Sequence, residues 1–240
     1  MDLKELKQGV DPNTFWYYQT KKLPLIRFIT KIYKKHNRKV VLVDVGSGSG
    51  FFMYEMERLM PEMIEKIFLV DIGYSDEEIK MTQNQKIEKT LSLPDKIENA
   101  IVVMMDVLEH LESDDNMLNE IRNRTSGVNY FFITVPAFMD LWSGHDVYLG
   151  HYRRYTSKTL RALLTRTGIT NYSMYYLYGA IFPAVWIFRK MVRGKKSNDS
   201  DIKPINPVVN SLLKFYHSIE MPLSRMNKLF GVTCAAEGEL

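Results

Sequence analysis

The sequence predicts an α/β fold in which a mostly parallel sheet is covered by helices on both faces. Two observations predict it: apolar, β-branched strand segments recur along the chain, and segments with helical spacing alternate with them. Strands joined through helices require right-handed crossovers, which place them in one parallel sheet. The 240 residues suffice for one large domain whose core needs no disulfide or metal.

Each expected element rests on a local pattern. Strands are expected where apolar or β-branched residues run together, at residues 40–45, 67–70, 100–105, 130–135, 171–177 and, as a last short strand, 232–236. Helices are expected where apolar residues recur with helical spacing, at residues 14–35, 51–63, 114–124, 156–168 and 206–230. In the first helix the apolar side is Leu23, Leu25, Ile26, Phe28, Ile29 and Ile32. Thr156 and Ser157 are both suitable N-caps.

The whole chain is expected to form a single domain, residues 1–240. Its expected parts are an N-terminal helical cap (1–38), a core (39–178), a helical insertion or lid before the last strand (179–230) and that strand (231–240). Residues 194–201, GKKSNDSD, form a polar linker within the insertion.

Composition narrows the class of protein. Cys234 is the only cysteine, which excludes an internal disulfide and a cysteine-based zinc site and suits a reducing cytoplasm. The N-terminus lacks the apolar core of a secretory signal. The longest apolar stretch, residues 177–188, contains Pro183 and is shorter than the roughly 20 residues that cross a bilayer. The net charge of +4 is compatible with an anionic ligand, a membrane face, nucleic acid or plain solubility.

A glycine-rich loop follows the first expected strand, in the segment VLVDVGSGSG at 41–50. Glycine permits tight turns and close backbone approach to a ligand, and ligands of open parallel sheets sit beyond the carboxyl ends of the strands. A plain turn is the alternative. Here the loop follows an expected strand and precedes an expected helix, and Asp71 stands at the end of the next strand. This context favours a nucleotide-type cofactor.

Two residues favour S-adenosylmethionine (SAM) over NAD. A dinucleotide fingerprint needs a small residue three positions after its second glycine, where this chain has Phe51. Asp44 precedes the first glycine by two positions. A carboxylate there repels a pyrophosphate but can accept hydrogen bonds from the cationic amino-acid end of SAM.

The pattern Asp44-x-Gly46-x-Gly48-x-Gly50 resembles motif I of the class I SAM-dependent methyltransferases. The resemblance implies a Rossmann-like, doubly wound sheet of seven strands, SAM as cofactor and S-adenosylhomocysteine as product. Asp71 matches the acid that binds the ribose hydroxyls in that family. The cofactor contacts it implies are Asp44, Gly46, Ser47, Gly48, Gly50, Asp71, Ile72, Asp106 and Val107.

Three further segments are similar to one subgroup, the small-molecule, UbiG-like methyltransferases. They are FWYYQTKK at 15–22, MMDVLEHL at 104–111 and WSGHDVYLGHYRRYT at 142–156, so the resemblance spans about residues 12–178. Ser47 stands where the family often has Cys or Ala, and Ala100 where an Asp commonly opens the fourth strand. Residues 86–97 offer no clear acid for the adenine.

Methyl transfer is an in-line displacement, so orientation supplies much of the acceleration. A base is required only when the acceptor is a weakly acidic hydroxyl or a protonated amine. The loops after Met105 and Val135 are expected to border the methyl group. Methyltransferases of small hydroxylated compounds carry a similar His-Asp pair after the fifth strand. The resemblance therefore implies that His145 is the base and that Asp146 orients His145 or contacts the substrate, and we expect Asp106 to take part in catalysis.

Acceptor contacts are expected at His151, Arg153, Arg154, Tyr17 and His110. Structural alternatives exist: the arginines can pair with surface acids, Glu109 and His110 can hold a helix start, and residues 16–18 can pack on the sheet. No metal site is expected, because the one combination weighed, His145, Asp146 and His151, matches no established ligand spacing.

The sequence therefore predicts O-methylation of a small, sugar-like, phosphorylated or lipid-linked acceptor, with bacterial surface-polysaccharide biosynthesis suggested by association. The alternatives are a nucleic-acid methyltransferase, which lacks a recognisable RNA-binding module here, a non-catalytic SAM-binding scaffold, and an NAD-dependent enzyme. We expect a cytoplasmic protein without a nucleic-acid partner, either free or resting on the inner membrane face through residues 177–196. The oligomeric state is left open.

Overall fold

The computed structural model describes residues 9–82, 86–192 and 202–240. Its centre is a seven-stranded sheet in the order β3-β2-β1-β5-β7-β9-β8. Neighbouring strands are parallel except β9, which runs antiparallel between β7 and β8. The seven-stranded, mostly parallel α/β fold expected from the sequence is confirmed.

The strands of this sheet are β1 (Val40–Val45), β2 (Ile64–Val70), β3 (Ile87–Thr90), β5 (Ala100–Met105), β7 (Tyr130–Pro136), β8 (Tyr172–Leu177) and β9 (Thr233–Glu239). A separate parallel pair is formed by β4 (Ile97–Glu98) and β6 (Thr125–Ser126). The α-helices are α2 (Trp16–Lys21), α3 (Leu23–His36), α4 (Phe51–Leu59), α5 (Asp76–Met81), α6 (Asp114–Arg124), α7 (Gly144–Leu149), α8 (Ser157–Arg166), α9 (Phe182–Val192) and α10 (Pro207–Leu223). Short 3-10 turns are η1 (Leu108–His110), η2 (Met139–Leu141) and η3 (Ser224–Met226).

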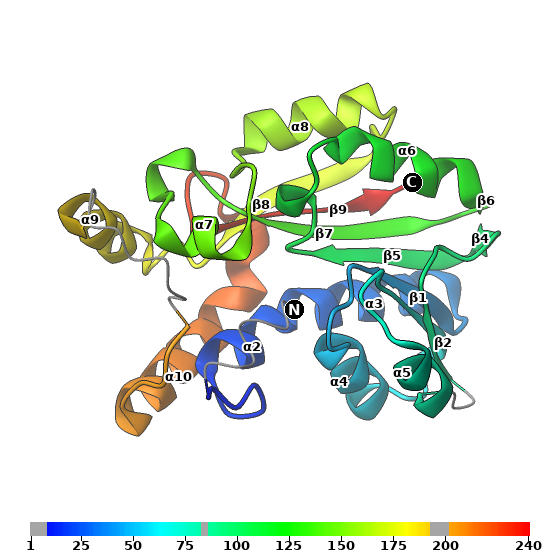
Figure 1. Ribbon diagram of the computed structural model, residues 1–240, viewed down its shortest axis with the longest axis horizontal. Helices are drawn as coiled ribbons and strands as arrows, with labels where there is room; N and C mark the ends of the chain where they lie inside the picture. The colour runs from blue at the N-terminus through cyan, green and yellow to red at the C-terminus, as the bar shows by residue number, and fades with distance from the viewer. Residues whose placement is uncertain (1–8, 83–85, 193–201) are drawn as a thin grey trace.

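Helices cover both faces of the sheet, with α6 and α8 on one side and α3, α4 and α5 on the other (Figure 1). The central strands are buried on both faces because successive side chains point to opposite sides. In β5, for example, Val102 packs in one apolar cluster and Ile101 in the other. This explains why these strands are continuous apolar runs.

Several expected elements match the structure and several do not. The strand at 100–105 and the helix at 114–124 have the expected bounds. The single helix expected at 14–35 is wrong: it is two helices that meet at Lys22, with Pro24 in the first turn of the second. The helix expected to reach residue 63 ends at Leu59, two residues before Pro61. The linker at 194–201 lies outside the described residues.

The segment between β8 and β9 packs against the N-terminal helices. Helix α10 contacts α2 and α3, and the ring of Trp16 stacks on His217 with centroids 5.0 Å apart. The Asn210 side chain accepts a hydrogen bond from the Trp16 backbone N–H at 2.9 Å. The expected cap and the expected insertion thus support each other at one end of the molecule, which is on the left in Figure 1.

Candidate active site

The glycine loop joins the end of β1 to the start of α4. The backbone N–H groups of Gly46 and Ser47 donate to the carbonyl of Val70, at 2.8 and 3.2 Å, which ties the loop to β2. Gly46 has φ +68°, and a Cβ there would lie 2.8 Å from a methyl group of Val107. Only glycine therefore lets the backbone pass this close to the end of β5.

Asp71 follows β2 and holds the loop from the side. One carboxylate oxygen accepts the N–H of Gly48 and the other accepts the N–H of Gly73, both at 2.8 Å. The next residue, Ile72, is 93% exposed. Each oxygen keeps a further lone pair, because a carboxylate has about four acceptor sites. The loop, the acid and an apolar side chain are thus gathered at one edge of the sheet.

Asp44 lies near the end of β1 and is buried. Burial raises the pKa of its carboxyl to about 7, and the negative charge of Asp71 adds to the effect. No residue of the described ranges donates a hydrogen bond to this carboxylate. A buried acid without such a donor fits a cationic ligand group, such as the ammonium that the resemblance assigns to it.

Asp106 follows β5 in the left-handed backbone conformation, at φ +58°. Its carboxylate forms an ion pair with Lys21 and accepts a hydrogen bond from the hydroxyl of Thr134 at 3.2 Å. The buried ammonium of Lys21 also donates to the hydroxyl of Tyr17 at 2.7 Å. Helix α2 is therefore anchored at the carboxyl end of β5. The sequence analysis missed Lys21, because nothing in the local pattern joins residues 85 positions apart.

Asp146 is fully buried in a network that differs from the expected one. It accepts the N–H of Ser143 at 2.8 Å, the Nδ1 of His151 at 2.9 Å, and the Nε and Nη2 of Arg154 at 2.7 and 3.1 Å. Burial acts to raise the pKa of this carboxyl, but the hydrogen bond from His151 and the charge of Arg154 outweigh burial and lower it. Asp146 therefore orients His151, whereas the sequence led us to expect that it would orient His145 or contact the substrate.

The two arginines expected to contact an acceptor have partners within the protein. Arg154 is 8% exposed and is committed to Asp146 and to the carbonyl of Ala137. Arg153 pairs with Asp114 at 3.0 Å and donates to the carbonyl of Glu112 at 2.6 Å. This is the structural alternative of the sequence analysis, so we no longer propose a substrate role for either arginine.

Three histidines gather beside this network. The ring centroids of His110 and His151 are 4.6 Å apart, and those of His145 and His151 are 6.4 Å apart. His145 lies in the first turn of α7, where its N–H donates to the Ser143 hydroxyl at 3.2 Å. The sequence analysis named all three residues, and the fold brings them together from two separate segments.

Glu109, beside His110, is fully buried, and neither of its carboxylate oxygens has a hydrogen-bond partner among the residues that the structure describes. Burial raises the pKa of this carboxyl to about 8, against the lowering effect of the charges on Lys21 and Arg154. The sequence analysis treated Glu109 as a helix-start residue. Its isolation in the interior marks it as a functional candidate, since an unpaired buried carboxyl is costly.

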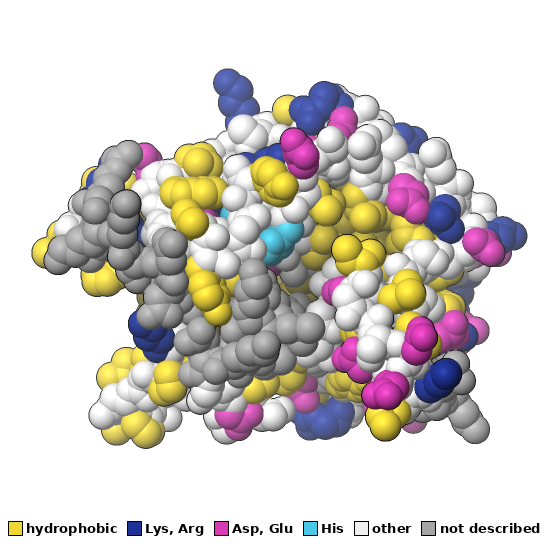
Figure 2. Space-filling model, in the orientation of Figure 1, with side chains coloured by type: hydrophobic (Ala, Val, Ile, Leu, Met, Phe, Trp, Pro, Cys, Tyr) yellow, Lys and Arg dark blue, Asp and Glu magenta, His cyan; other side chains and the backbone are white. Residues whose placement is uncertain are grey.

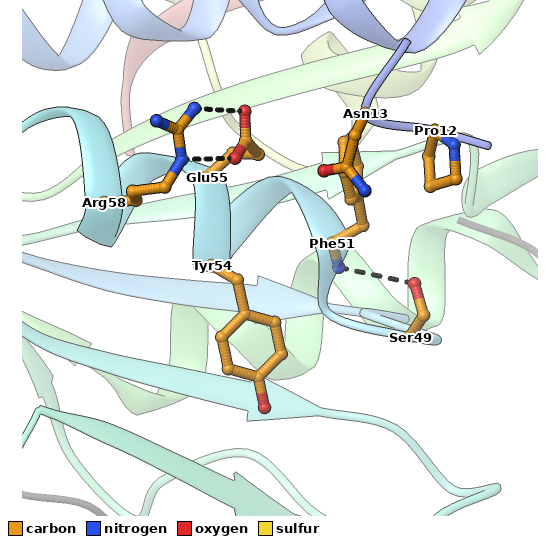
Figure 3. Close-up of a pocket in the computed structure, with 7 residues that line it drawn as sticks. All are labelled: Pro12, Asn13, Ser49, Phe51, Tyr54, Glu55 and Arg58. Carbon is orange, nitrogen blue, oxygen red and sulfur yellow. Dashed lines mark hydrogen bonds and ion pairs between the residues drawn. The ribbon is translucent and has the colours of Figure 1, made fainter. Parts of the chain in front are cut away.

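A shallow pocket of about 320 Å³ lies on the flank of α4. Figure 3 shows its lining residues, Pro12, Asn13, Ser49, Phe51, Tyr54, Glu55 and Arg58. The carboxylate of Glu55 is already bound by Arg58 at 2.8 Å and by Lys22 at 2.6 Å. None of the acids at the sheet edge lines this pocket, so we do not place the cofactor in it.

Figure 2 shows a separate hollow near the centre of its view, with hydrophobic side chains and a histidine beside it.

Comparison with known proteins identifies the family. Residues 15–174 match a family model described as a methyltransferase domain, so the chain belongs to that family. A comparison with curated proteins finds no match. The chain is a methyltransferase with the fold of the class I enzymes, whose methyl donor is SAM. The family match does not distinguish the UbiG-like subgroup.

Solved structures share the fold at low sequence identity. A SAM-dependent methyltransferase from Archaeoglobus fulgidus has a TM-score of 0.56 at 19% identity, with 99% of this chain and 98% of that chain covered. A possible histamine N-methyltransferase from Thermotoga maritima has a TM-score of 0.51 at 14% identity, with 93% and 91% covered. The plantazolicin methyltransferase, in complex with a desmethyl analogue and S-adenosylhomocysteine, has a TM-score of 0.55 at 12% identity, with 92% and 84% covered.

Proposed function

We propose that this protein is an O-methyltransferase that acts on a small or lipid-linked acceptor with a free hydroxyl. The observation that carries the proposal is the placement of two groups of residues. The glycine loop, Asp71 and Asp106 follow three adjacent parallel strands, β1, β2 and β5. The histidines and Glu109 follow β5 and β7 at the same edge, where ligands of such sheets bind.

The residues divide into binding and proton-handling roles. SAM supplies an activated methyl group on a sulfonium. The backbone of the glycine loop and the carboxylate of Asp71 would bind the nucleoside part, and Asp44 would bind the ammonium. Helix α2, held by the ion pair between Lys21 and Asp106, would close the site against water. His145 would accept the hydroxyl proton of the acceptor.

Replacing Asp71 by alanine is expected to weaken SAM binding by at least about 100-fold. Two charge-assisted hydrogen bonds would be lost, each worth roughly 1.5–3 kcal/mol, and the loop would lose the partner of the Gly48 N–H. Calorimetry with SAM measures the change. Asp95→Ala is the matched control, because the Asp95 side chain is fully exposed and its ion pair, at 3.5 Å, is with Arg124 of α6. Unchanged affinity in Asp71→Ala would remove Asp71 from the cofactor site.

Exposed apolar side chains on α9 and α10 support a lipid-linked acceptor. The larger ones are Trp186, Ile187, Phe188, Met191, Val208, Val209, Leu212, Phe215, Tyr216, Ile219 and Leu223. Figure 2 shows this end of the molecule as clusters of hydrophobic side chains. Lys190 lies 5.3 Å from the ring centroid of Trp186, which suits the boundary between headgroups and acyl chains. Within the described residues, no helix is long and apolar enough to span a bilayer. We therefore propose a contact with the membrane surface.

Vesicle co-sedimentation tests this contact. The protein is expected to bind phosphatidylcholine vesicles that contain phosphatidylglycerol, and the double variant Ile187→Glu, Phe215→Glu is expected to bind at least about tenfold more weakly. The control carries Met81→Glu and Val128→Glu, which are also exposed apolar positions but lie outside α9 and α10. Absence of binding by the unmodified protein would refute the contact. If the unmodified protein is a dimer and the double variant is a monomer, the exposed apolar surface of α9 and α10 would instead be an interface between two copies of the chain.

A further inference from the structure

The isolated carboxylate of Glu109 faces two imidazoles. One ligand atom each from Glu109, His110 and His151 lies within 4.8 Å of the others. This is close enough for one ion to bind all three. Both oxygens of Glu109 are buried and have no hydrogen-bond partner within residues 9–82, 86–192 and 202–240. The described structure therefore places in its interior a carboxylate whose only evident partner would be a ligand held between these residues.

The backbone fixes the three residues relative to one another. Glu109 and His110 belong to η1, directly after β5, and His151 follows α7. The N–H of Tyr152 donates to the carbonyl of Glu109 at 2.8 Å, and the N–H of His151 donates to the carbonyl of Asp146 at 2.9 Å. The first bond joins the two segments at the point where the side chains meet, and the second fixes His151 within its own segment. The backbone therefore holds the cluster together.

The orientation of His151 also favours a bound cation. Its side chain is 5% exposed, and its Nδ1 is directed at the carboxylate of Asp146. Asp146 is itself fixed by Arg154 and by the N–H of Ser143. Metal-binding histidines commonly donate one ring N–H to a carboxylate, which fixes the tautomer and directs the other nitrogen at the ion. Here that other nitrogen is Nε2.

We propose that Glu109, His110 and His151 bind a divalent transition-metal cation. Two imidazoles and one carboxylate suit Zn²⁺, Mn²⁺ or Fe²⁺ and leave coordination positions open. An acceptor hydroxyl would occupy an open position, and the cation would favour its ionised form, as Zn²⁺ does for bound water. This role for the acceptor rests on the proposed function, whereas binding of the cation does not. The sequence analysis expected no metal, and the combination it weighed included Asp146, whose oxygens the structure commits to other donors.

The test is titration of the full-length, chelator-treated protein with Zn²⁺ and Mn²⁺ by calorimetry, followed by the visible absorption of added Co²⁺. One equivalent is expected to bind, and Co²⁺ is expected to give the strong absorption of a four- or five-coordinate site. Glu109→Gln and His151→Gln are each expected to lower the affinity by at least about 100-fold. Glu109→Gln keeps the size of the side chain, so a folding defect is not expected to mimic the effect.

His36→Gln is the matched control, because His36 pairs with Tyr130 on another part of the molecule. No stoichiometric binding by the unmodified protein, or equal affinity in Glu109→Gln and His36→Gln, would overturn the proposed cation site. SAM calorimetry on the same samples separates the two proposals. SAM binding without cation binding refutes only the metal, and cation binding without SAM binding refutes the proposed function while the cation site stands.

Discussion

Replacing Asp146 by alanine is expected to lower the free energy of unfolding by about 3–5 kcal/mol, because it leaves a buried guanidinium without its counter-charge. Arg154 is 8% exposed and donates two of its hydrogen bonds to this carboxylate. The variant also removes the acceptor for His151 and for the N–H of Ser143. Urea unfolding followed by circular dichroism measures the loss. Asp140→Ala is the control, since Asp140 is largely exposed and its ion pair with Lys190 is long, at 3.9 Å.

The same network sets a pH dependence. The folded state lowers the pKa of Asp146 below its ordinary value, so the stabilisation is present at neutral pH. It is lost as the pH falls below about 4, where the carboxyl of the unfolded chain is protonated. The Asp146→Ala variant is expected to lose less stability than the unmodified protein between about pH 6 and about pH 3, the range in which ordinary carboxyl groups titrate. Parallel curves would show that the charge of Asp146 does not contribute to stability.

The parts of the fold that sequence predicted well are those decided by local pattern. The strand at 100–105 is apolar throughout, and both of its faces are buried, so its bounds follow from composition. The sequence analysis missed β3, a four-residue edge strand with alternating burial, and α5, which buries no side chain. Two helix predictions missed a proline signal. The helix expected at 14–35 is divided before Pro24, which favours a helix start, and the helix expected at 51–63 ends before Pro61, which restricts the residue before it.

The candidate site also contains residues that local sequence pattern predicts and residues that only the fold brings together. The glycines, Asp44 and Asp71 could be proposed from the sequence because their expected chemistry depends on spacing along the chain. The pairing of Asp146 with His151 and Arg154 could not be predicted, because it depends on how the chain turns after α7. Lys21 and the isolation of Glu109 depend on which distant segments meet, which no local pattern records. The burial of these charged side chains could therefore be recognised only from the folded structure.

Replacing His145 by alanine is expected to lower turnover by roughly 10²–10⁴-fold, the range for loss of a general base, with SAM affinity unchanged. The reason is its placement: His145 lies at the start of α7, beside His151, and Asp146 fixes His151 rather than His145. His145 is therefore the member of the histidine group for which we propose proton transfer. A screen for transfer of a tritiated methyl group to hydroxylated, sugar-like, phosphorylated and lipid-linked acceptors identifies a substrate. Turnover of that substrate is then compared between the unmodified protein and His145→Ala.

Two measurements distinguish this role from a structural one. Cation binding is expected to persist in His145→Ala, because the proposed ligands are Glu109, His110 and His151. Turnover is expected to recover in part when imidazole is added, since a small diffusible base can replace a missing side chain. Full turnover in His145→Ala would exclude His145 as the base and indicate an acceptor that is already ionised. If His145→Ala loses both turnover and cation binding, and imidazole does not restore turnover, then His145 supports the structure of the Glu109, His110 and His151 cluster.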